Sequence, residues 1–414
     1  MTTLFFLTSL LFGWIAWNLY HPNFTSMRLG LVSFVAGLVA GELALHTIFW
    51  QVMIVAFFAL FGAISGLFGA LGLLIGIASW AAIAFKYYES TYSKSEVKQS
   101  LIDGLGEDYE KEIDEEFRLK FGQDPDRDLI RHPLRRDDSQ VELIAGVPFG
   151  DFGRALDIRR GKSSTAERLK PVLLQIHGGG WTYGRRDDGQ GLPLMNHMAK
   201  RDWICVASSY RLSPMATFPD HIIDCKQALV WIKDHIEEYG GDPNFIVVTG
   251  GSAGAHLSSL LAYHPNHPEF QPGFEDRDTS VQGVIPFYGL YDLTDSDGLQ
   301  HHEGTFEFLE DSIFKLDISG NEETYQQASP WFHVDENAPP SFVIHGQDDT
   351  LIPVECARSF TQKLSGVSKN KVVYLEVAGA QHAFDVFPSM RSEYVKFGVE
   401  KFLAWTYSQY LKSV

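Results

Sequence analysis

A serine flanked by glycines follows directly on an apolar run. Residues 245–249 (Phe-Ile-Val-Val-Thr) lead into Gly-Gly-Ser-Ala-Gly at 250–254, and a helical stretch follows. In this strand–turn–helix context the pattern G-x-S-x-G places the serine on a sharp turn, where its hydroxyl projects from the edge of a sheet. The glycines two positions before and after the serine leave room for close approach of the backbone. The segment therefore predicts that Ser252 is a nucleophile.

A second glycine-rich segment follows another apolar run. Residues 172–176 (Val-Leu-Leu-Gln-Ile) end in His177, and three glycines come next. Backbone N–H groups stabilise negative charge that develops on a substrate carbonyl, and one such donor contributes about 3 kcal/mol. We assign the oxyanion hole to this loop and to the residue after the serine, with Gly179, Gly180 and Ala253 as donors and Gly178 as support of the turn. The alternative is a glycine-rich loop without a catalytic role.

A serine hydroxyl is a weak nucleophile at neutral pH, so it requires a base and a carboxylate that orients the base. After a serine of this type, the acid and then the histidine follow in chain order at later strand ends. The apolar run 341–344 leads to Asp348 and Asp349, and the run 372–377 leads to His382. His382 fits the position of the base, and both aspartates fit the position of the acid.

Short β-rich runs alternate with helical stretches from residue 139 onward. Six runs are typical of buried strands: 172–176, 204–208, 245–249, 283–287, 341–344 and 372–376. Helical stretches such as 222–239 and 253–263 separate them. This alternation predicts an α/β fold over residues 139–414, with a doubly wound, mostly parallel sheet and helices on both faces. Catalytic groups in such folds gather at the carboxyl ends of the strands.

The first 85 residues have a different composition. They contain one basic residue, Arg28, and one acidic residue, Glu42. Residues 3–20 and 29–85 are almost entirely apolar, and a helix of about 20 apolar residues crosses a bilayer. We expect an all-α transmembrane domain at 1–85 with three or four spans. A cleaved signal peptide is disfavoured, because no positive segment precedes the first apolar stretch.

The charges near this domain bear on its orientation. With three spans, Arg28 and the lysines at 86, 94 and 98 fall on one side. The positive-inside tendency then puts the remainder of the chain in the cytoplasm, at a bacterial inner membrane. Four spans favour no orientation. Glu42 is either a functional acid inside the membrane or a residue at a helix end that reaches water, and we expect the second.

Three Gly-x-x-x-Gly motifs occur in the apolar region, at 37–41, 62–66 and 72–76. Such motifs let helix backbones approach closely. They predict a homo-oligomer through the membrane helices, unless the glycines only reflect the usual composition of these segments.

Two further segments are possible covers of a site. Residues 86–138 form a juxtamembrane helical region, in which Tyr109, Ile113, Phe117 and Phe121 recur every four residues and predict an amphipathic helix. This helix either packs on residues 139–414 or forms part of a lid. Residues 293–327 form an insertion between strands that could complete a lid.

The overall charge disfavours one class of partner. The formal net charge is −18, and all of it lies in residues 86–414. Such a surface repels phosphate, so nucleic-acid binding is disfavoured. The three cysteines, Cys205, Cys225 and Cys356, are widely separated and predict neither a disulfide framework nor a zinc site. No metal or organic cofactor is implied.

The motifs together resemble those of a known family. Residues from about 140 to 410 are similar to the α/β-hydrolase superfamily, in its hormone-sensitive-lipase-like branch of carboxylesterases, and to mycobacterial Lip-type esterases. The family patterns HGGG, YRLxP, GxSxG and HGxxDxxxP match residues 177–180, 210–214, 250–254 and 345–353. The runs 239–245 and 271–276 carry the Lip-type likeness. The spacing of the HGxxD pattern assigns the acid to Asp349 rather than Asp348.

The resemblance implies a function and also shows departures. It implies a serine carboxylesterase or lipase that hydrolyses carboxylic esters through Ser252, His382 and Asp349, with a small-molecule or lipid ester as substrate. The apolar residues 1–85 add a membrane anchor with the bilayer as partner, and this anchor favours apolar esters. Gly251 stands where much of the branch has Asp, and Ala255 replaces a further glycine, which leaves the substrate open. His256, Arg211 and Asp224 are interpreted as structural. The alternatives are an amidase or peptidase on the same fold, or a non-catalytic binding module.

Overall fold

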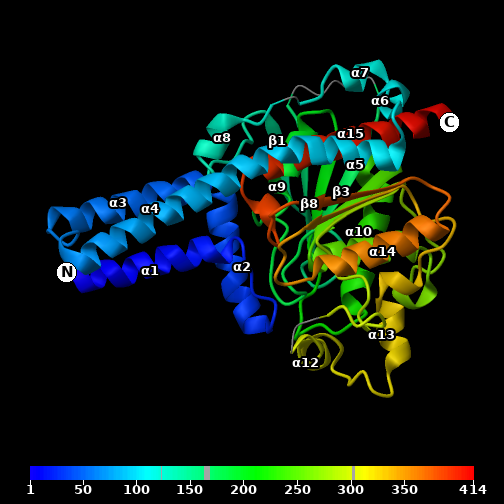
Figure 1. Cartoon of the computed structure of the whole chain (residues 1–414). Helices are drawn as coiled ribbons and strands as arrows, with labels where there is room; N and C mark the ends of the chain where they lie inside the picture. The colour runs from blue at the N-terminus through cyan, green and yellow to red at the C-terminus, as the bar shows by residue number, and fades with distance from the viewer. Residues whose placement is uncertain (123, 163–167, 301–303) are drawn as a thin grey trace.

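Eight strands form one sheet in the computed structural model of the chain, which describes residues 1–122, 124–162, 168–300 and 304–414 (Figure 1). The order across the sheet is β1-β2-β4-β3-β5-β6-β7-β8. The strands are β1 Val141–Pro148, β2 Ala155–Gly161, β3 Lys170–Ile176, β4 Ile204–Ser208, β5 Gly241–Gly251, β6 Gly283–Phe287, β7 Ser341–Gly346 and β8 Val372–Val377. The six strands predicted from the sequence are all confirmed.

The sheet is mostly parallel, as predicted. Strands β4, β3, β5, β6, β7 and β8 pair in parallel, whereas β1 and β2 form an antiparallel edge. Sequence analysis misses these two edge strands, because the charged residues Asp157, Arg159 and Arg160 interrupt the apolar pattern of β2. Asp157 is nonetheless buried, where it pairs with Arg186 at 2.9 Å.

Helices cover both faces of the sheet and make three layers. Helices α10, α11 and α14 pack on one face, and α5, α9 and α15 pack on the other. Side chains of β3 alternate between the two cores, with Val172 and Leu174 in the first and Leu173 in the second. The helices are α5 Ser93–Leu105, α9 Leu192–Ala199, α10 Asp220–His235, α11 Ala253–Tyr263, α14 Val354–Val367 and α15 Met390–Ser413.

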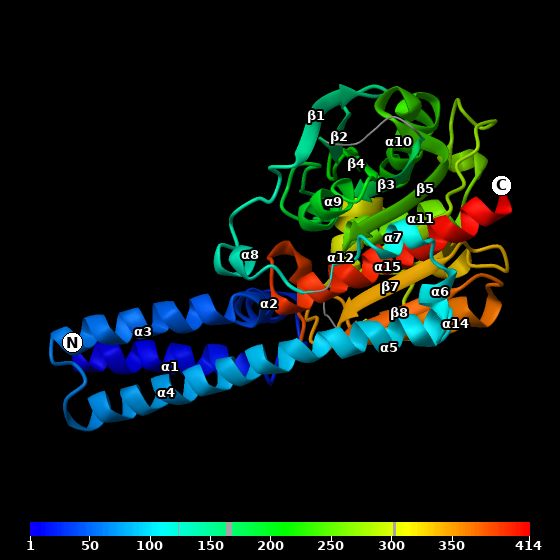
Figure 2. The same cartoon turned by 90° about the horizontal axis from the view of Figure 1, so that it is seen from above.

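Four helices precede this three-layered body: α1 Thr2–Asn18, α2 Met27–Glu42, α3 Ala44–Leu60 and α4 Gly66–Glu89. Helices α1, α3 and α4 project together from the body, and α2 turns across their base (Figures 1 and 2). By length and composition, one helix among the described residues could cross a membrane, the continuous run Gly66–Leu105. Helices α2 and α3, which meet at a bend of 96°, together make a second possible span, and α1 is shorter.

Two of the Gly-x-x-x-Gly motifs have structural roles inside this chain. A Cβ at Gly72 of α4 would lie 3.0 Å from side-chain atoms of Phe5 and Ser9, so this glycine lets α1 and α4 pack closely. Gly62 and Gly66 have positive φ angles of 70° and 71° and lie at the turn between α3 and α4. The motif at 62–66 is therefore a turn rather than a helix-packing surface.

Glu42 ends α2, as expected, but the prediction that it reaches water is wrong. Its side chain is buried and lies 3.2 Å from Arg391 and 2.5 Å from the Ser389 hydroxyl, which donates to it. Both partners belong to the start of α15. A buried carboxylate requires such partners, so Glu42 joins α2 to the body of the protein.

The predicted amphipathic helix between Tyr109 and Phe121 is also wrong. The chain forms two single-turn helices, α6 Tyr109–Glu112 and α7 Glu115–Arg118, separated by extended backbone at Ile113. Tertiary contacts replace the helical ones, since the Asp114 N–H donates to the Ser408 hydroxyl at 3.0 Å. This segment packs on α15, which agrees with the structural interpretation rather than with a lid. A further short helix, α8 Arg127–Arg131, follows it.

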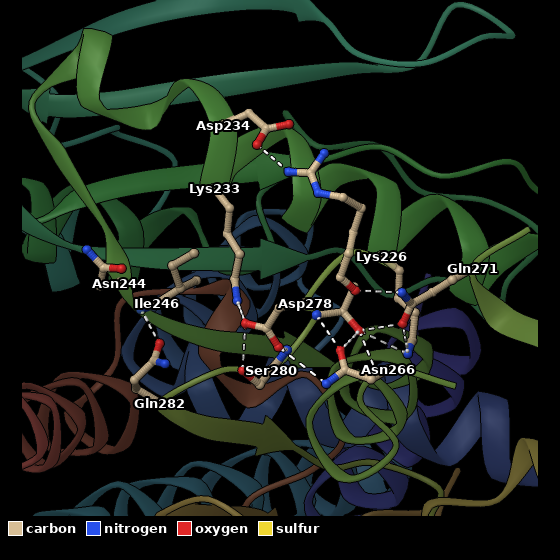
Figure 3. Close-up of polar contacts among 12 residues, drawn as sticks. Lys226, Lys233, Asp234, Asn244, Ile246, Asn266, Gln271, Asp278, Ser280 and Gln282 are labelled. Atoms are coloured by element: carbon tan, nitrogen blue, oxygen red, sulfur yellow. Dashed lines mark hydrogen bonds and ion pairs between the residues drawn. The ribbon is translucent and has the colours of Figure 1, made fainter. Parts of the chain in front are cut away.

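A buried lysine organises the loop that follows α11 (Figure 3). Lys226 on α10 is fully buried, and its ammonium donates to the carbonyl of His264 at 2.8 Å and to the side chains of Gln271 and Thr279, both at 3.2 Å. Gln271 opens the run 271–276 that carries part of the family likeness. At the surface nearby, Lys233 pairs with Asp278 at 2.5 Å.

These two lysines provide a matched test of what holds this loop. Lys226→Met should lower the free energy of unfolding by about 3 kcal/mol, because it leaves buried acceptors without a donor. Lys233→Met should cost less than about 1 kcal/mol, since its ion pair is partly exposed. Chemical denaturation of the two purified variants measures the difference. Equal losses would contradict the role given to Lys226.

Candidate active site

Ser252 occupies a strained turn between β5 and α11. Its backbone has φ 59° and ψ −123°, a conformation that residues other than glycine rarely adopt. Its N–H donates to the carbonyl of Phe287 at 3.0 Å, which ties the turn to β6. A Cβ at Gly254 would overlap the carbonyl of Ile176, so only glycine permits this approach of the turn to β3.

The glycine loop after β3 leaves two amides free to point at a ligand. The Gly178 N–H donates to Gln190 Oε1 at 2.6 Å, so Gly178 holds the loop rather than a substrate. Gly179 and Gly180 have φ angles of 112° and 56°, and within the described residues their N–H groups have no acceptor. Ala253 is the first residue of α11, where helical N–H groups have no partner in the helix.

His382 and Asp349 are hydrogen-bonded to each other. Asp349 follows β7 and His382 follows β8, and His382 Nδ1 lies 2.7 Å from Asp349 Oδ2. The other carboxylate oxygen accepts from the N–H groups of Leu351 and Ile352, both at 2.9 Å. A carboxylate only accepts, so Nδ1 carries the proton and Nε2 is left to accept one.

The two neighbouring aspartates have different surroundings. Burial by itself raises the pKa of Asp349, but the charge of His382 and hydrogen bonds from His345 and His382 outweigh it and hold this pKa well below its usual range. Burial raises the pKa of Asp348. The backbone N–H of Asp348 donates to Ala380, and it is Asp349 rather than Asp348 that reaches the histidine.

A tyrosine that sequence analysis overlooked lies between the serine turn and the histidine. The ring of Tyr288, just after β6, lies 4.6 Å from the ring of His382. Its hydroxyl donates to the half-buried carboxylate of Asp385 and accepts from Gln190 at 3.4 Å. Tyr288 follows a strand end, as the predicted site residues do, which is a signal that could have found it. Gln190 lies in a loop and Asp385 in a short 3-10 helix, and neither directly follows a strand.

Of the three residues interpreted as structural, His256 and Asp224 are buried and Arg211 is partly exposed. Trp181 donates to His256 Nδ1 at 3.2 Å, and His256 Nε2 lies 2.7 Å from the carbonyl of Ala328. Burial lowers the pKa of His256 to about 4, so this imidazole is neutral. Arg211 binds the buried carboxylate of Asp224 at 2.8 Å.

Comparison with known proteins identifies the family. A family model described as BD-FAE matches residues 156–364, just over half of the chain. The chain belongs to the BD-FAE family. The match begins in β2 and ends in α14, so it contains the glycine loop, Ser252 and Asp349 but neither His382 nor the four N-terminal helices. Among the described residues, no group of three or more His, Cys, Asp or Glu is arranged to hold a metal ion.

Two relatives of this BD-FAE chain are mycobacterial. The probable carboxylic ester hydrolase LipM of Mycobacterium tuberculosis is 50% identical over 264 residues, which cover 63% of this chain and 61% of LipM. Esterase LipQ of the same organism is 42% identical over 283 residues, which cover 68% of this chain and 66% of LipQ. In both cases the match spans less than two thirds of the relative. The resemblance to mycobacterial Lip-type esterases is confirmed, and the prediction of an ester hydrolase agrees with these names.

A solved structure supports the fold. The truncated form of a carbohydrate esterase from gut microbiota has a TM-score of 0.53 with this chain at 20% identity. The alignment covers 68% of this chain and 99% of that chain. The eight-stranded mixed sheet and its helices thus fit an α/β-hydrolase.

The insertion at 293–327 lies over the glycine loop. It contains the helices α12 Thr305–Phe308 and α13 Glu322–Ala328, while residues 301–303 lie outside the described residues. The Cζ atom of Phe308 lies 3.6 Å from the point that a Cβ atom added to Gly180 would occupy. The carbonyl of Ile313 accepts from the N–H of Phe218 at 3.0 Å, so the insertion is fixed to the segment after the YRLxP motif.

Gly251, the residue before the serine, has no room for a side chain. A Cβ at this position would lie 2.6 Å from Gln190 Nε2 and 2.7 Å from the Tyr288 hydroxyl. The space that a side chain would need is therefore filled by these two groups.

A glycine-to-alanine pair tests this crowding. Gly251→Ala should lower the free energy of unfolding by about 1–3 kcal/mol, because the added methyl group overpacks a filled site. Gly366→Ala, in α14 with open space around it, should be neutral or stabilise by about 0.5–1 kcal/mol. Thermal unfolding of both variants measures the contrast. A neutral Gly251→Ala variant would mean that Tyr288 and Gln190 move freely.

Proposed function

We propose that the protein is a membrane-anchored serine carboxylic ester hydrolase. The observation that carries the proposal is the hydrogen bond between His382 and Asp349. Both residues follow the carboxyl ends of strands, as Ser252 and the glycine loop do. The parallel strands β3, β5, β7 and β8 lead into these groups, and β6, which leads into Tyr288, lies between β5 and β7. The names of LipM and LipQ agree with this activity.

The first half of the reaction forms an acyl-enzyme. His382 Nε2 takes the proton of the Ser252 hydroxyl as its oxygen attacks the ester carbonyl, and the N–H groups of Gly179, Gly180 and Ala253 stabilise the resulting oxyanion. The imidazolium is stabilised by Asp349, which stays ionised. When the carbon–oxygen bond to the alcohol breaks, His382 gives its proton to the leaving alcohol.

The second half restores the enzyme. His382 removes a proton from water as the water oxygen attacks the acyl carbon, and the same amides stabilise the second oxyanion. The ester bond to Ser252 then breaks, the proton returns to the serine oxygen, and the carboxylic acid leaves. One ester and one water give one acid and one alcohol.

The N-terminal helices form the proposed membrane anchor. Helices α1, α3 and α4 expose many large apolar side chains, among them Leu4, Leu7, Leu11, Phe57, Leu60, Phe61, Leu67, Phe68 and Leu74. Soluble proteins rarely expose apolar surface of this extent. The three helices would span together, with Met1 and the turn at 61–65 on the far side of the bilayer. The body then lies on the same side as Arg28 and Lys86, which the positive-inside tendency assigns to the cytoplasm.

The nucleophile is tested by removing its oxygen. Ser252→Ala should lower ester turnover by about 10⁶-fold without changing the thermal stability of the purified protein. Turnover of p-nitrophenyl butyrate measures the first, and a fluorophosphonate probe should label the unmodified protein but not the variant. Persistent turnover in Ser252→Ala would end the proposal.

The choice of acid is tested with two adjacent aspartates. Asp349→Asn should lower kcat by about 10⁴-fold, because an amide at this position favours the wrong tautomer of His382. Asp348→Asn should leave kcat nearly unchanged, since its carboxylate does not reach the imidazole. A larger effect at Asp348 would reverse the assignment.

The membrane topology is tested with single cysteines. In a Cys356→Ser background, Ser65→Cys should react with an impermeant maleimide from the outside of intact cells, whereas Asp138→Cys should react only after the cells are opened. Labelling of both positions from one side would exclude the three-span arrangement.

A further inference from the structure

Helix α2 packs on the two loops that carry Asp349 and His382. Thr350, fully buried next to Asp349, donates its hydroxyl proton to the carbonyl of Gly30 at 2.9 Å. Gln381, next to His382, lies against Gly37, where a Cβ would come within 2.9 Å of its Cγ. The Gln381 side-chain oxygen in turn accepts from the N–H of Thr350 at 3.2 Å. An element from outside the matched family region therefore covers both loops.

Phe34, on the same face of α2, lies beside His382. Gly30, Phe34 and Gly37 are spaced by four and three residues, so they share one side of the helix. The ring of Phe34 lies edge-on to that of His382, with 6.0 Å between centroids and 79° between planes. In the proposed reaction His382 protonates the leaving alcohol, so a side chain beside its ring lies next to the alcohol portion of the ester.

The opposite face of α2 is apolar and exposed. Leu29, Leu31, Val32, Val35 and Val39 have exposed fractions between 42% and 53%. This surface continues into the exposed apolar surface of α3, which starts two residues after α2 ends. The ion pair between Glu42 and Arg391 fixes α2 to the body at this junction. The occupant that suits a large apolar face continuous with a membrane anchor is lipid at the membrane interface.

We propose that α2 forms the alcohol-side wall of the active site and holds that wall in the membrane interface, so that the substrate is an ester with a long apolar alcohol portion that enters from the bilayer. This inference rests on the proposed serine hydrolase function. Phe34 is then the residue that sets the preference for the alcohol, through contact with the carbons beyond the first.

The test uses the full chain in phospholipid vesicles and two series of esters. One series consists of butyrate esters whose alcohol ranges from methyl to dodecyl. The other consists of methyl esters whose acid chain is lengthened up to dodecanoate. Phe34→Ala should lower kcat/KM for dodecyl butyrate by about tenfold, which corresponds to the loss of apolar contact with one or two methylene groups. Methyl butyrate and methyl dodecanoate should change by less than about twofold, because neither has an alcohol that reaches the ring.

Control variants separate this effect from loss of structure. Phe85→Ala makes the same change on α4, at a side chain that is 54% exposed, and should leave all esters unaffected. Phe34→Leu keeps an apolar side chain and should retain most of the dodecyl butyrate activity. The rate of fluorophosphonate labelling of Ser252 reports whether the site is intact in each variant. Equal losses on all esters with Phe34→Ala, or no loss with intact labelling, would overturn the inference.

The source of the ester is tested separately. Dodecyl butyrate placed in the vesicles that hold the enzyme should be hydrolysed faster than the same amount placed in separate vesicles. Equal rates would mean delivery through water and would contradict entry from the bilayer. If the unmodified protein hydrolyses no ester of either series, the proposed function fails instead, and this result is distinct from a failure of the inference about Phe34.

Discussion

A fully buried carboxylate, Asp349, is the group on which the arrangement of the site depends. Taking a carboxylate out of water costs several kcal/mol unless donors surround it. Here two backbone N–H groups satisfy one oxygen, and His382 and His345 lie at 2.7 Å and 3.3 Å from the other. These donors keep Asp349 ionised, and its charge in turn fixes the tautomer and orientation of His382. The loops after β7 and β8 must therefore fold together.

Close packing at the serine turn imposes a second constraint. The turn contacts β3 and β6 so closely that Gly251 and Gly254 have no room for a side chain. Tyr288 fills the space beside Gly251, and its ring lies against that of His382 with an angle of 56° between the planes. One aromatic side chain thus connects the turn that carries the serine with the loop that carries the histidine. Tyr288 and Gln190 occupy the space that a side chain at position 251 would need.

The N-terminal helices make side-chain contacts with the body and are not merely connected to it along the chain. Helix α2 contacts the residues next to Asp349 and His382, and the pair Glu42–Arg391 is buried between the two parts. An unpaired charge at either position would be costly, which couples the docking of α2 to the fold of α15. The BD-FAE match, at residues 156–364, does not include this element, which lies against the two loops at the end of the sheet.

The sequence by itself determined the parts whose signal is local. Six buried strands, the helices between them, the serine turn and the glycine loop each depend on apolar runs and glycines within a few residues, and all six strands are present as predicted. The order of the strand ends singled out His382, and the resemblance to the HGxxD pattern of the family separated Asp349 from Asp348. The acidic net charge and the apolar character of the first 85 residues also follow from the sequence alone.

Only the tertiary structure decided what depends on contacts between distant residues. Strand β2 contains charged residues such as Asp157, which is buried because it pairs with Arg186. Its sequence therefore lacks the apolar pattern of a buried strand. The segment 109–121 breaks its helix because α15 offers it hydrogen bonds, and Glu42 turns from water to Arg391, 349 positions away along the chain. The contact of Phe34 with His382 joins residues from opposite ends of the chain. Local patterns contain no information on such pairs, because packing and charge pairing exist only once the chain has folded.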